Sequence, residues 1–485
     1  MQPRNGPWRP AAALAAGLAV LALSAIACSS SPTPTLSMRL VTPAGLDPRA
    51  ASALDHVAIR VRETPPGAAA REVVVLEGDA ATDFALDFAL YSTASRLDVG
   101  VDFTGPAAHL LGAAPPFVPD ETDGVVDVLV GAPASCALRA GVTLAAPRSG
   151  AHVARLGSYA LLVGGTPSSS AAAARVELID MLGARPTISD ALLVGGASFD
   201  ASKADVVALS SRAALVLARD RDEALRYDLD AAASARSSAV LVHAGARAGT
   251  LVARATSGAA IVGGADPTGA PITDITWVSF DGRTTHGTLA VARRAPAVLA
   301  LDDGTLLVAG GAERAGAPLL ERIAEAAASV PLASTDDDGI RRGASLVSVP
   351  SSGGALLLGG LDAGGAPRTD ARIFDACPGA CTLVEDAELA APMADATLAA
   401  APGGGALLFG GRDPSGAPTD AQWLVTLAAT APRLVLSRRL PLAAPRASAA
   451  ALVLPSGVVW LLSGADASGP RDDVDICFPD ALALP

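Results

Sequence analysis

The sequence predicts an all-β protein in which a small β-sandwich precedes a seven-bladed β-propeller. Three features of its 485 residues predict this fold class. A unit made of a short apolar run, a Gly-Gly pair and a loop holding Gly and often Pro recurs from residue 135 to the end. Its copies lie about 50 residues apart, a spacing typical of four-stranded propeller blades. Before residue 135, short apolar runs alternate with polar residues, as half-buried strands do.

The first 27 residues have the composition of an export signal: two arginines, an apolar run, then a small residue before Cys28 and a Ser/Pro/Thr stretch. They resemble a bacterial lipoprotein signal peptide, residues 1–27, whose cleavage leaves a cysteine that carries lipid. The resemblance implies lipidation of Cys28, a flexible tether over 28–37 and a chain anchored to a membrane of the bacterial cell envelope. By analogy with other lipoproteins, Ser29 after that cysteine is compatible with export to the outer membrane, on its periplasmic or its surface face. The alternative is an ordinary secretory signal cleaved near Ala27, with Cys28 incidental.

Residues 38–134 alternate in a way that predicts a first β domain. Runs such as 56–62 and 96–103 place an apolar side chain at every second position, with Gly, Pro and Asp between the runs. Six or seven such strands in about 100 residues are typical of an immunoglobulin-like or transthyretin-like sandwich. A disordered stalk with one hairpin is the alternative. We expect this domain to space or support the propeller.

The double glycine marks the repeat in residues 135–485. Its copies are Gly164-Gly165, Gly263-Gly264, Gly310-Gly311, Gly359-Gly360, Gly410-Gly411 and, with Ser463 in the first place, Gly464. The first positions lie 99, 47, 49, 51 and 53 residues apart. Because 99 is close to twice the other intervals, one copy has lost its glycines, and 214–219 and 224–229 stand where its second and third strands belong. That makes seven copies, with six or eight blades as the alternative.

Each copy predicts four short strands. In the copy that contains Gly410, they cover 397–400, 406–409, 422–425 and 433–436. Such a unit in seven copies predicts a propeller. Two successive residues without a Cβ let the chain turn near the crowded inner ring and let neighbouring blades approach closely.

Three elements of the repeat resemble the kelch motif: the double glycine after an apolar strand, an aromatic residue further on, and Pro-Arg before the next blade. The aromatic residues are Trp277, Phe374 and Trp423, and the Pro-Arg pairs end at Arg148 and Arg446. The resemblance covers about 70% of the chain and implies the fold of kelch-repeat, galactose-oxidase-like propellers. Two departures are the second copy, which lacks the glycines, and the missing tyrosine between the glycines and the aromatic residue; a near match, ending at Met393, keeps all but the arginine.

The cysteines indicate how the ring closes. Besides Cys28 there are four, an even number in an exported chain, where disulfides persist: Cys136, Cys377, Cys381 and Cys477. Cys377 and Cys381 flank a tight turn and form the local pair. The last copy ends after its third strand, 474–477, and 135–139 can supply the fourth. We therefore predict a Cys136–Cys477 disulfide that locks the ring. A metal site is the alternative, although no histidine lies near these cysteines in sequence.

Composition and motifs argue against several classes of function. A net charge of −13 repels nucleic acid. No G-x-S-x-G, P-loop or dinucleotide fingerprint occurs. Aspartates of the repeat loops are typical turn formers, and His152, His243 and His286 have no acidic partner nearby in sequence. We expect no catalytic residue, no metal and no cofactor.

We therefore predict a non-catalytic envelope lipoprotein whose propeller loop face binds a protein or a glycan. The alternative is a carbohydrate-active propeller enzyme that is oxidase-, sialidase- or epimerase-like. The two differ at the mouth of the ring. An enzyme should gather His, Tyr, Asp, Glu or Arg side chains there from different blades, whereas a scaffold leaves Ala, Gly and Ser.

Overall fold

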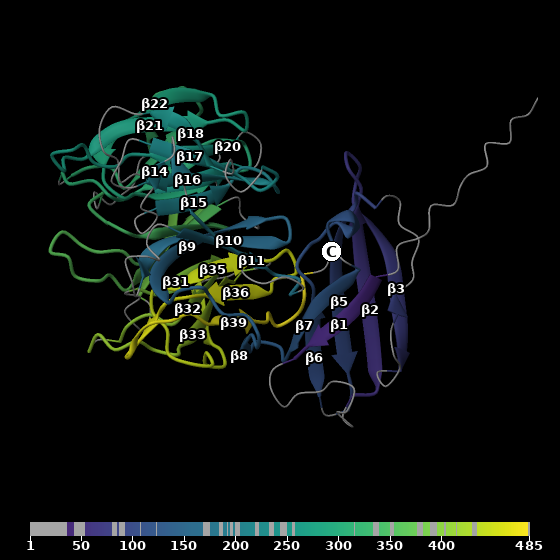
Figure 1. Ribbon diagram of the computed structural model, residues 1–485. Coiled ribbons are helices and arrows are strands. Elements are labelled where there is room, and N and C mark those ends of the chain that lie inside the picture. The colour runs from purple at the N-terminus through teal and green to yellow at the C-terminus, as the bar shows by residue number, and fades with distance from the viewer. Residues whose placement is uncertain are drawn as a thin grey trace, which may run out of the picture. The chain divides into compact units, whose positions relative to one another are not determined.

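The computed structural model shows an all-β chain built of one seven-stranded sheet, seven four-stranded sheets and two short hairpins (Figure 1). It describes residues 36–42, 54–79, 85–86, 93–106, 108–122, 124–167, 175–183, 188–191, 193–194, 197–198, 204–218, 223–231, 237–242, 250–254, 258–314, 316–332, 339–349, 354–375, 382–388, 395–401, 404–413, 415–428 and 434–483. Within these ranges, no helix has the length and apolar character that crossing a membrane requires.

The seven-stranded sheet comes first and has the order β3-β2-β5-β6-β7-β1-β4. Its elements are β1 Leu36–Val41, β2 His56–Thr64, β3 Arg71–Asp79, β4 Ala85–Leu86, β5 Arg96–Thr104, β6 His109–Ala113, the short 3₁₀ turn Pro119–Glu121 and β7 Val125–Gly131. Alternate residues of β2, β5 and β7 bury one apolar cluster, which includes Ile59, Val101 and Val128. The alternation of apolar and polar residues predicted for these strands is therefore confirmed, and its apolar positions form the buried face of the sheet.

The two separate sheets of a sandwich are not confirmed by these strands. β1 pairs in parallel with β7 and antiparallel with β4, so the described strands form one hydrogen-bonded sheet. The sequence also missed β6, because its run His-Leu-Leu-Gly-Ala does not alternate. On the face opposite the apolar cluster, Leu111 and Leu129 pack with Phe478 near the end of the chain.

Seven four-stranded sheets come next along the chain, and we number them blades 1 to 7 in chain order. Blade 1 holds β9 Arg148–Leu156, β10 Tyr159–Pro167, β11 Arg175–Asp180 and β12 Ile188–Ala191; blade 2 holds β15 Ala204–Ala208, β16 Ala213–Ala218, β17 Glu223–Asp228 and β18 Ser237–Val242. Blade 3 holds β19 Thr250–Arg254, β20 Gly258–Val262, β21 Ile272–Val278 and β22 Thr284–Arg293; blade 4 holds β23 Ala297–Ala300, β24 Leu306–Ala309, β25 Leu320–Ile323 and β26 Val330–Pro331. Blade 2 is the copy without glycines, and it is complete.

The remaining blades continue the same order of strands. Blade 5 holds β27 Ser345–Val349, β28 Gly354–Leu358, β29 Asp370–Asp375 and β30 Thr382–Glu388; blade 6 holds β31 Thr397–Ala400, β32 Ala406–Phe409, β33 Gln422–Leu427 and β34 Leu434–Arg438. Blade 7 holds β35 Ala450–Val453, β36 Val459–Leu462, β39 Val474–Cys477 and β8 Cys136–Leu138. The short hairpins are β13 Leu193–Val194 with β14 Ala197–Ser198, and β37 Ala465–Asp466 with β38 Gly469–Pro470.

The blades form a closed ring. The first strand of each blade contacts the first strand of the next, and β35 of blade 7 contacts β9 of blade 1. A separate apolar cluster fills each of the seven interfaces between neighbouring blades. The predicted seven-bladed propeller is confirmed, and its first strands are the innermost ones.

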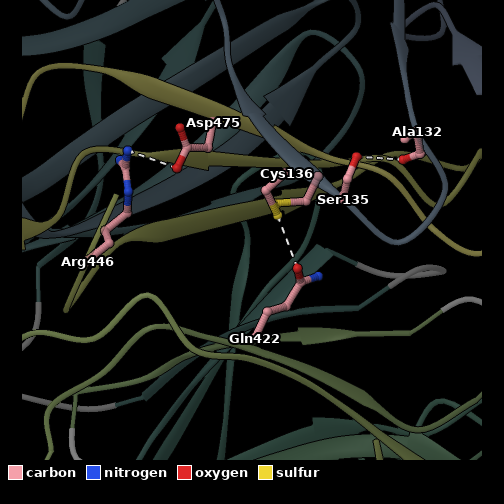
Figure 2. The surroundings of a disulfide bond; sticks show 7 residues. Ala132, Ser135, Cys136, Gln422, Arg446 and Asp475 are labelled. Atoms are coloured by element: carbon pink, nitrogen blue, oxygen red, sulfur yellow. Dashed lines mark hydrogen bonds and ion pairs between the residues drawn. A yellow bond between two sulfur atoms is a disulfide. The ribbon is translucent and has the colours of Figure 1, made fainter. Parts of the chain in front are cut away.

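Blade 7 takes its outermost strand from the beginning of the propeller. β8 pairs antiparallel with β39, in a register that places Cys136 opposite Cys477. The two cysteines form a disulfide with a sequence separation of 341 (Figure 2). Closing a loop of this length stabilises a fold by roughly 3–5 kcal/mol in the chain-entropy account. The predicted ring-closing pair is therefore confirmed.

At four places around the ring, an arginine joins two neighbouring blades. These residues are Arg148, Arg293, Arg341 and Arg446, and we call them the joining arginines. Each lies just before or at the start of an innermost strand. Their side chains donate to the carbonyl of the first repeat position of their own blade, at Gly164, Gly310, Gly359 and Ser463, over 2.5–3.2 Å. Each also pairs with an acidic residue of the third strand, at Glu177, Glu321 and Asp370, or just before it, at Asp473.

The main chain of the same arginines reaches back to the preceding blade. The second glycine of that blade donates its N–H to the arginine carbonyl, as in Gly311 to Arg341 at 2.7 Å and Gly411 to Arg446 at 2.9 Å. This approach explains the double glycine. A Cβ on Gly310 would lie 2.0 Å from the carbonyl oxygen of Arg341, and φ there is +66°. Such a position favours a residue without a side chain, and blade 7 is the departure, with Ser463 at a φ of +62°.

Candidate functional site

The innermost strands differ in chemistry around the ring. Those of blades 4 to 7 consist only of Ala, Val, Leu, Ser and Thr. Ionisable residues occur in the innermost strands of blades 1 to 3, at Arg148, His152, Arg155, Asp205 and Arg254. Arg148 is a joining arginine and pairs within its own blade. The other four ionisable residues of the described innermost strands therefore all belong to three successive blades, on one side of the ring.

His152 of β9 and Asp205 of β15 form a pair across the interface between blades 1 and 2. The imidazole Nε2 lies 2.7 Å from the carboxylate Oδ1. The His152 side chain is 40% exposed and the Asp205 side chain 10%. A buried carboxylate that orients a more exposed imidazole is a recurring arrangement for moving protons in enzymes. No local pattern in the sequence indicates this partner, because the two residues belong to different repeats.

A pocket of about 410 Å³ opens beside the turns that come after the innermost strands of blades 1 and 2. Arg155 and Gly157 line it from blade 1, and Ala208 and Ser210 from blade 2. Arg96 of β5 and the segment 116–118 of the first domain complete its wall. Pockets of this volume are in the range that holds small ligands.

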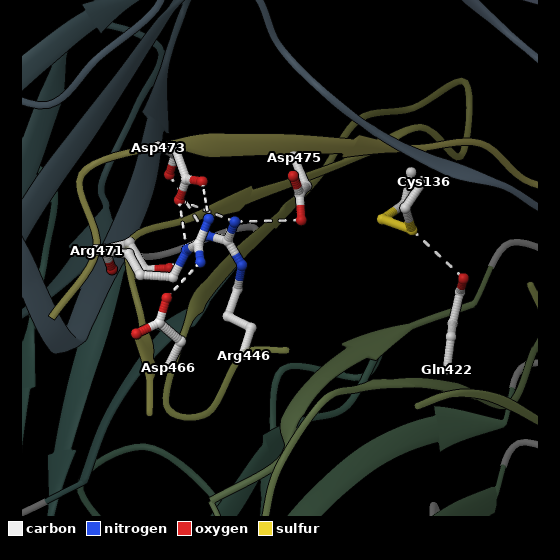
Figure 3. Close-up of polar contacts among 9 residues, drawn as sticks. Cys136, Gln422, Arg446, Asp466, Arg471, Asp473 and Asp475 are labelled. Atoms are coloured by element: carbon white, nitrogen blue, oxygen red, sulfur yellow. Dashed lines mark hydrogen bonds and ion pairs between the residues drawn. A yellow bond between two sulfur atoms is a disulfide. The ribbon is translucent and has the colours of Figure 1, made fainter. Parts of the chain in front are cut away.

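A second polar cluster lies in blade 7 (Figure 3). Arg446 pairs with Asp473 at 2.9 Å and with Asp475 at 3.2 Å, and Arg471 pairs with Asp466 and Asp473. Asp475 is fully buried, and neither of its carboxylate oxygens accepts a hydrogen bond from the described residues. Burial raises the pKa of Asp475, and Arg446 offsets this only in part.

Register shows why Asp475 lacks hydrogen bonds. It pairs with Leu461, two residues before the first repeat position, as Glu177 of blade 1 and Glu321 of blade 4 do with their own second strands. Those longer side chains reach both the joining arginine and a backbone N–H three residues before it. The shorter aspartate makes neither hydrogen bond among the described residues, so blade 7 carries a buried carboxylate with a single ion pair.

The aspartates of the repeat loops act within their own turns. Asp266 Oδ1 accepts from the N–H groups of Thr268 and Ala270, at 2.8 and 2.9 Å. Asp413 does the same in blade 6. The pKa of Asp266 is lowered, mainly by a hydrogen bond from the Thr268 hydroxyl and also by these backbone N–H groups. Among the described residues, no group of three His, Cys, Asp or Glu side chains is placed to hold a metal ion.

The other predicted residues lie in separate parts of the chain. His286 lies exposed on β22, the outermost strand of blade 3. The first glycines Gly164, Gly263, Gly310, Gly359 and Gly410 and the second glycines Gly165, Gly264, Gly311, Gly360, Gly411 and Gly464 all have positive φ. Cys28, Cys377, Cys381 and His243 lie outside the described residues.

Sequence reasoning missed the shared role of the joining arginines. It noted Pro-Arg only as a motif, whereas the contacts assign the same task to Arg293 and Arg341, which have no proline before them. A usable signal was present: each arginine lies 16 to 18 residues before the first repeat position of its blade.

Comparison with known proteins supports the fold. No family model matches the chain, and neither does any curated protein. Among solved structures, a copper-bound fungal alcohol oxidase described as part of the AA5 family is 14% identical, over 70% of this chain and 74% of its own, with a TM-score of 0.50. A streptogramin B lyase (10% identity, 69% and 95% coverage, TM-score 0.46) and YjhT (11%, 68% and 95%, 0.40) are also similar. At these identities the likeness shows the propeller fold alone.

The prediction that the chain is not an enzyme is contradicted by this comparison, since the propeller fold that it shows is shared with a copper-bound alcohol oxidase. That prediction depended on the lack of catalytic motifs and of acidic partners for the histidines. In a propeller, residues from separate repeats meet at the inner strands, so a site need not appear as a local motif. His152 and Asp205, which meet although they belong to different blades, illustrate this.

Proposed function

We propose that the protein is a carbohydrate-active propeller enzyme, of the epimerase-like kind, in which His152 and Asp205 form the proton-transfer pair. The observation that carries this proposal is the contact between Nε2 of His152 and Oδ1 of Asp205, on the two innermost strands whose later residues Arg155 and Ala208 line the pocket. Asp205 would hold the imidazole in one tautomer and orientation. The exposed part of His152 would then take a proton from a carbon or hydroxyl of the sugar and return one.

Proton transfer is favoured over oxidase-like and sialidase-like chemistry by the residues that the described inner strands carry. They hold a histidine with an acidic partner, which suits acid–base chemistry directly. Positioned general acid–base groups contribute about 10²- to 10⁴-fold to a rate. Loss of the imidazole should therefore remove most of the turnover without removing the fold.

The test is exchange in deuterated water. A panel of neutral and acidic reducing sugars is incubated with the purified protein in D₂O. NMR then follows two quantities: the exchange of carbon-bound protons for deuterium and the interconversion of the sugar's stereoisomers. We expect turnover of at least one sugar, and a loss of about 10²-fold or more in His152→Gln. His286→Gln, on the outermost strand of blade 3, is the matched control and should keep full activity. Equal activity in both variants, or no turnover of any sugar, would refute the proposal.

The kelch membership of the repeats and the lipid anchor at Cys28 stay proposals as well. We infer that an anchored enzyme of this kind works on envelope or environmental glycans at the outer membrane. Detergent partitioning tests the anchor. The full-length chain should enter the detergent phase and the Cys28→Ala variant the aqueous phase, whereas the same partitioning of both would exclude the lipid.

A further inference from the structure

The pocket beside blades 1 and 2 is lined by an arginine that has no hydrogen-bond or ion-pair partner among the described residues. Arg155, one residue before the end of β9, is half-buried in the pocket wall. Among the described residues, its guanidinium makes no hydrogen bond or ion pair. Burial lowers the pKa of Arg155, the neighbouring Arg96 lowers it further, and Asp98 opposes both. A partly desolvated cation without hydrogen-bond acceptors is costly, so the pocket holds a group that a bound anion would satisfy.

The other charges of the pocket wall already have partners. Arg96, 44% exposed, donates through Nη2 to Asp98 Oδ2 at 3.0 Å. Glu121 pairs with Arg212 at 3.3 Å, and Arg212 also pairs with Asp230 at 2.5 Å. Asp98 therefore offsets one of the two arginines that face the pocket, and the Glu121 carboxylate is neutralised by a third arginine. Among the charged side chains that line the pocket, Arg155 is therefore the one without a hydrogen-bond or ion-pair partner in the described part of the chain.

The rest of the wall suits a small ligand with one acidic group. Pro116, Phe117 and Val118 give the pocket an apolar side. Arg155 comes three residues after His152 on the same innermost strand, a rise of about 10 Å, which is the length of one to two sugar rings. Because the register is regular, their side chains leave opposite faces of the strand, so the oxyanion site is argued from Arg155 and its own surroundings.

We propose that this pocket is an oxyanion site, in which Arg155, supported by Arg96, binds the carboxylate or sulfate ester of an acidic sugar. Guanidinium groups bind such anions through two parallel hydrogen bonds. That the ligand is a sugar rests on the proposed function; that the site takes an oxyanion rests on Arg155 and its surroundings alone.

Calorimetric titration of the full chain tests the site. The probes are glucuronate, which carries a carboxylate, glucose 6-sulfate, which carries a sulfate ester, and glucose, which carries neither. We expect one or both acidic sugars to bind and glucose to bind at least tenfold more weakly. Arg155→Gln should weaken the acidic probe about 10- to 100-fold, the usual effect of losing hydrogen bonds to a charged group. Arg283→Gln, whose side chain is 86% exposed on a turn of blade 3, is the control and should bind as the wild type does.

Three results would overturn the oxyanion site: no binding of either acidic sugar, equal binding of glucose, or unchanged affinity in Arg155→Gln. A misfolded variant is recognised from its melting temperature, which Arg155→Gln should leave unchanged or raise, because a partly buried unmatched cation is removed. The His152→Gln variant separates this inference from the proposed function. It should bind glucuronate normally and lack turnover. Tight binding without turnover by the wild type would keep the oxyanion site and reject the enzyme.

Discussion

The N–H of Gly464 donates a hydrogen bond of 3.0 Å to the carbonyl oxygen of Arg148, and this bond joins the last blade of the propeller to the first. The side chain of the same arginine holds Glu177 at 2.5 Å within blade 1. At the outermost strand of blade 7, the Cys136–Cys477 disulfide closes the ring a second time. Closure therefore depends on an inner polar contact that also recurs between other blades and on an outer covalent bond at blade 7.

The joining arginine at the closure should be more important for stability than an ordinary ion pair. Arg148→Met leaves Glu177 fully buried without its cation, which typically costs about 3–5 kcal/mol. Arg148→Met combined with Glu177→Leu removes the whole pair and should recover much of that loss. Thermal melts followed by circular dichroism measure both. Equal destabilisation of the single and double variants would show that the pair does not have this role.

The disulfide should contribute roughly 3–5 kcal/mol to unfolding in the chain-entropy account. Replacing both Cys136 and Cys477 by Ser should lower the melting temperature under non-reducing conditions. Adding a reductant should lower that of the wild type to a similar value. The double variant, measured with and without reductant, shows how much any other disulfide contributes. A wild type that melts like the variant without reductant would contradict the covalent lock.

The double glycine can be tested with two substitutions that differ only in their surroundings. Gly310→Ala places a Cβ 2.0 Å from the Arg341 carbonyl, whereas Gly316→Ala, at a similar φ of +74°, meets nothing within 4 Å. We expect Gly316→Ala to cost about 1 kcal/mol for its backbone conformation alone. Gly310→Ala should cost several times more, because blades 4 and 5 must separate. Similar melting temperatures for the two variants would contradict the close approach of the blades.

Asp475 should make stability depend on pH. Its pKa in the folded chain is raised above the usual 3.8 by burial, so the folded state holds the proton more tightly than the unfolded state. Ionisation therefore costs stability: the penalty is absent below about pH 3.8, grows as the pH rises to the raised pKa, and is constant above it. The melting temperature of Asp475→Asn, relative to the wild type, should rise over that window and then level off. A difference that does not change with pH would show that Asp475 titrates normally.

Much of the propeller could be predicted because each blade repeats the same local signals. The interval of 99 residues between Gly164 and Gly263 was enough to place the degenerate blade, and β16 and β17 lie where it was expected. The closing strand could be inferred from Cys136 and Cys477, because a disulfide links positions at a fixed distance. The first sheet was harder to predict, since the pairing of β1 with both β7 and β4 is not encoded in a local alternation.

The candidate site could not be predicted in the same way. His152 and Asp205 meet only because two innermost strands lie side by side, and no spacing in the sequence marks that contact. Arg155 gains its significance from Arg96, which belongs to another domain of the chain. Local periodicity predicts strands, whereas electrostatics between distant strands depends on the assembled ring.

We propose that ligands of this propeller bind at blades 1 and 2 and the adjoining wall of the first domain. Hydrogen–deuterium exchange with and without glucuronate tests it most directly. We predict that the ligand slows exchange in peptides that cover 152–158 and 205–212, together with the start of β5, and leaves blades 4 to 6 unchanged. Protection in blades 4 to 6, or none in β9 and the turn after β15, would contradict the claim.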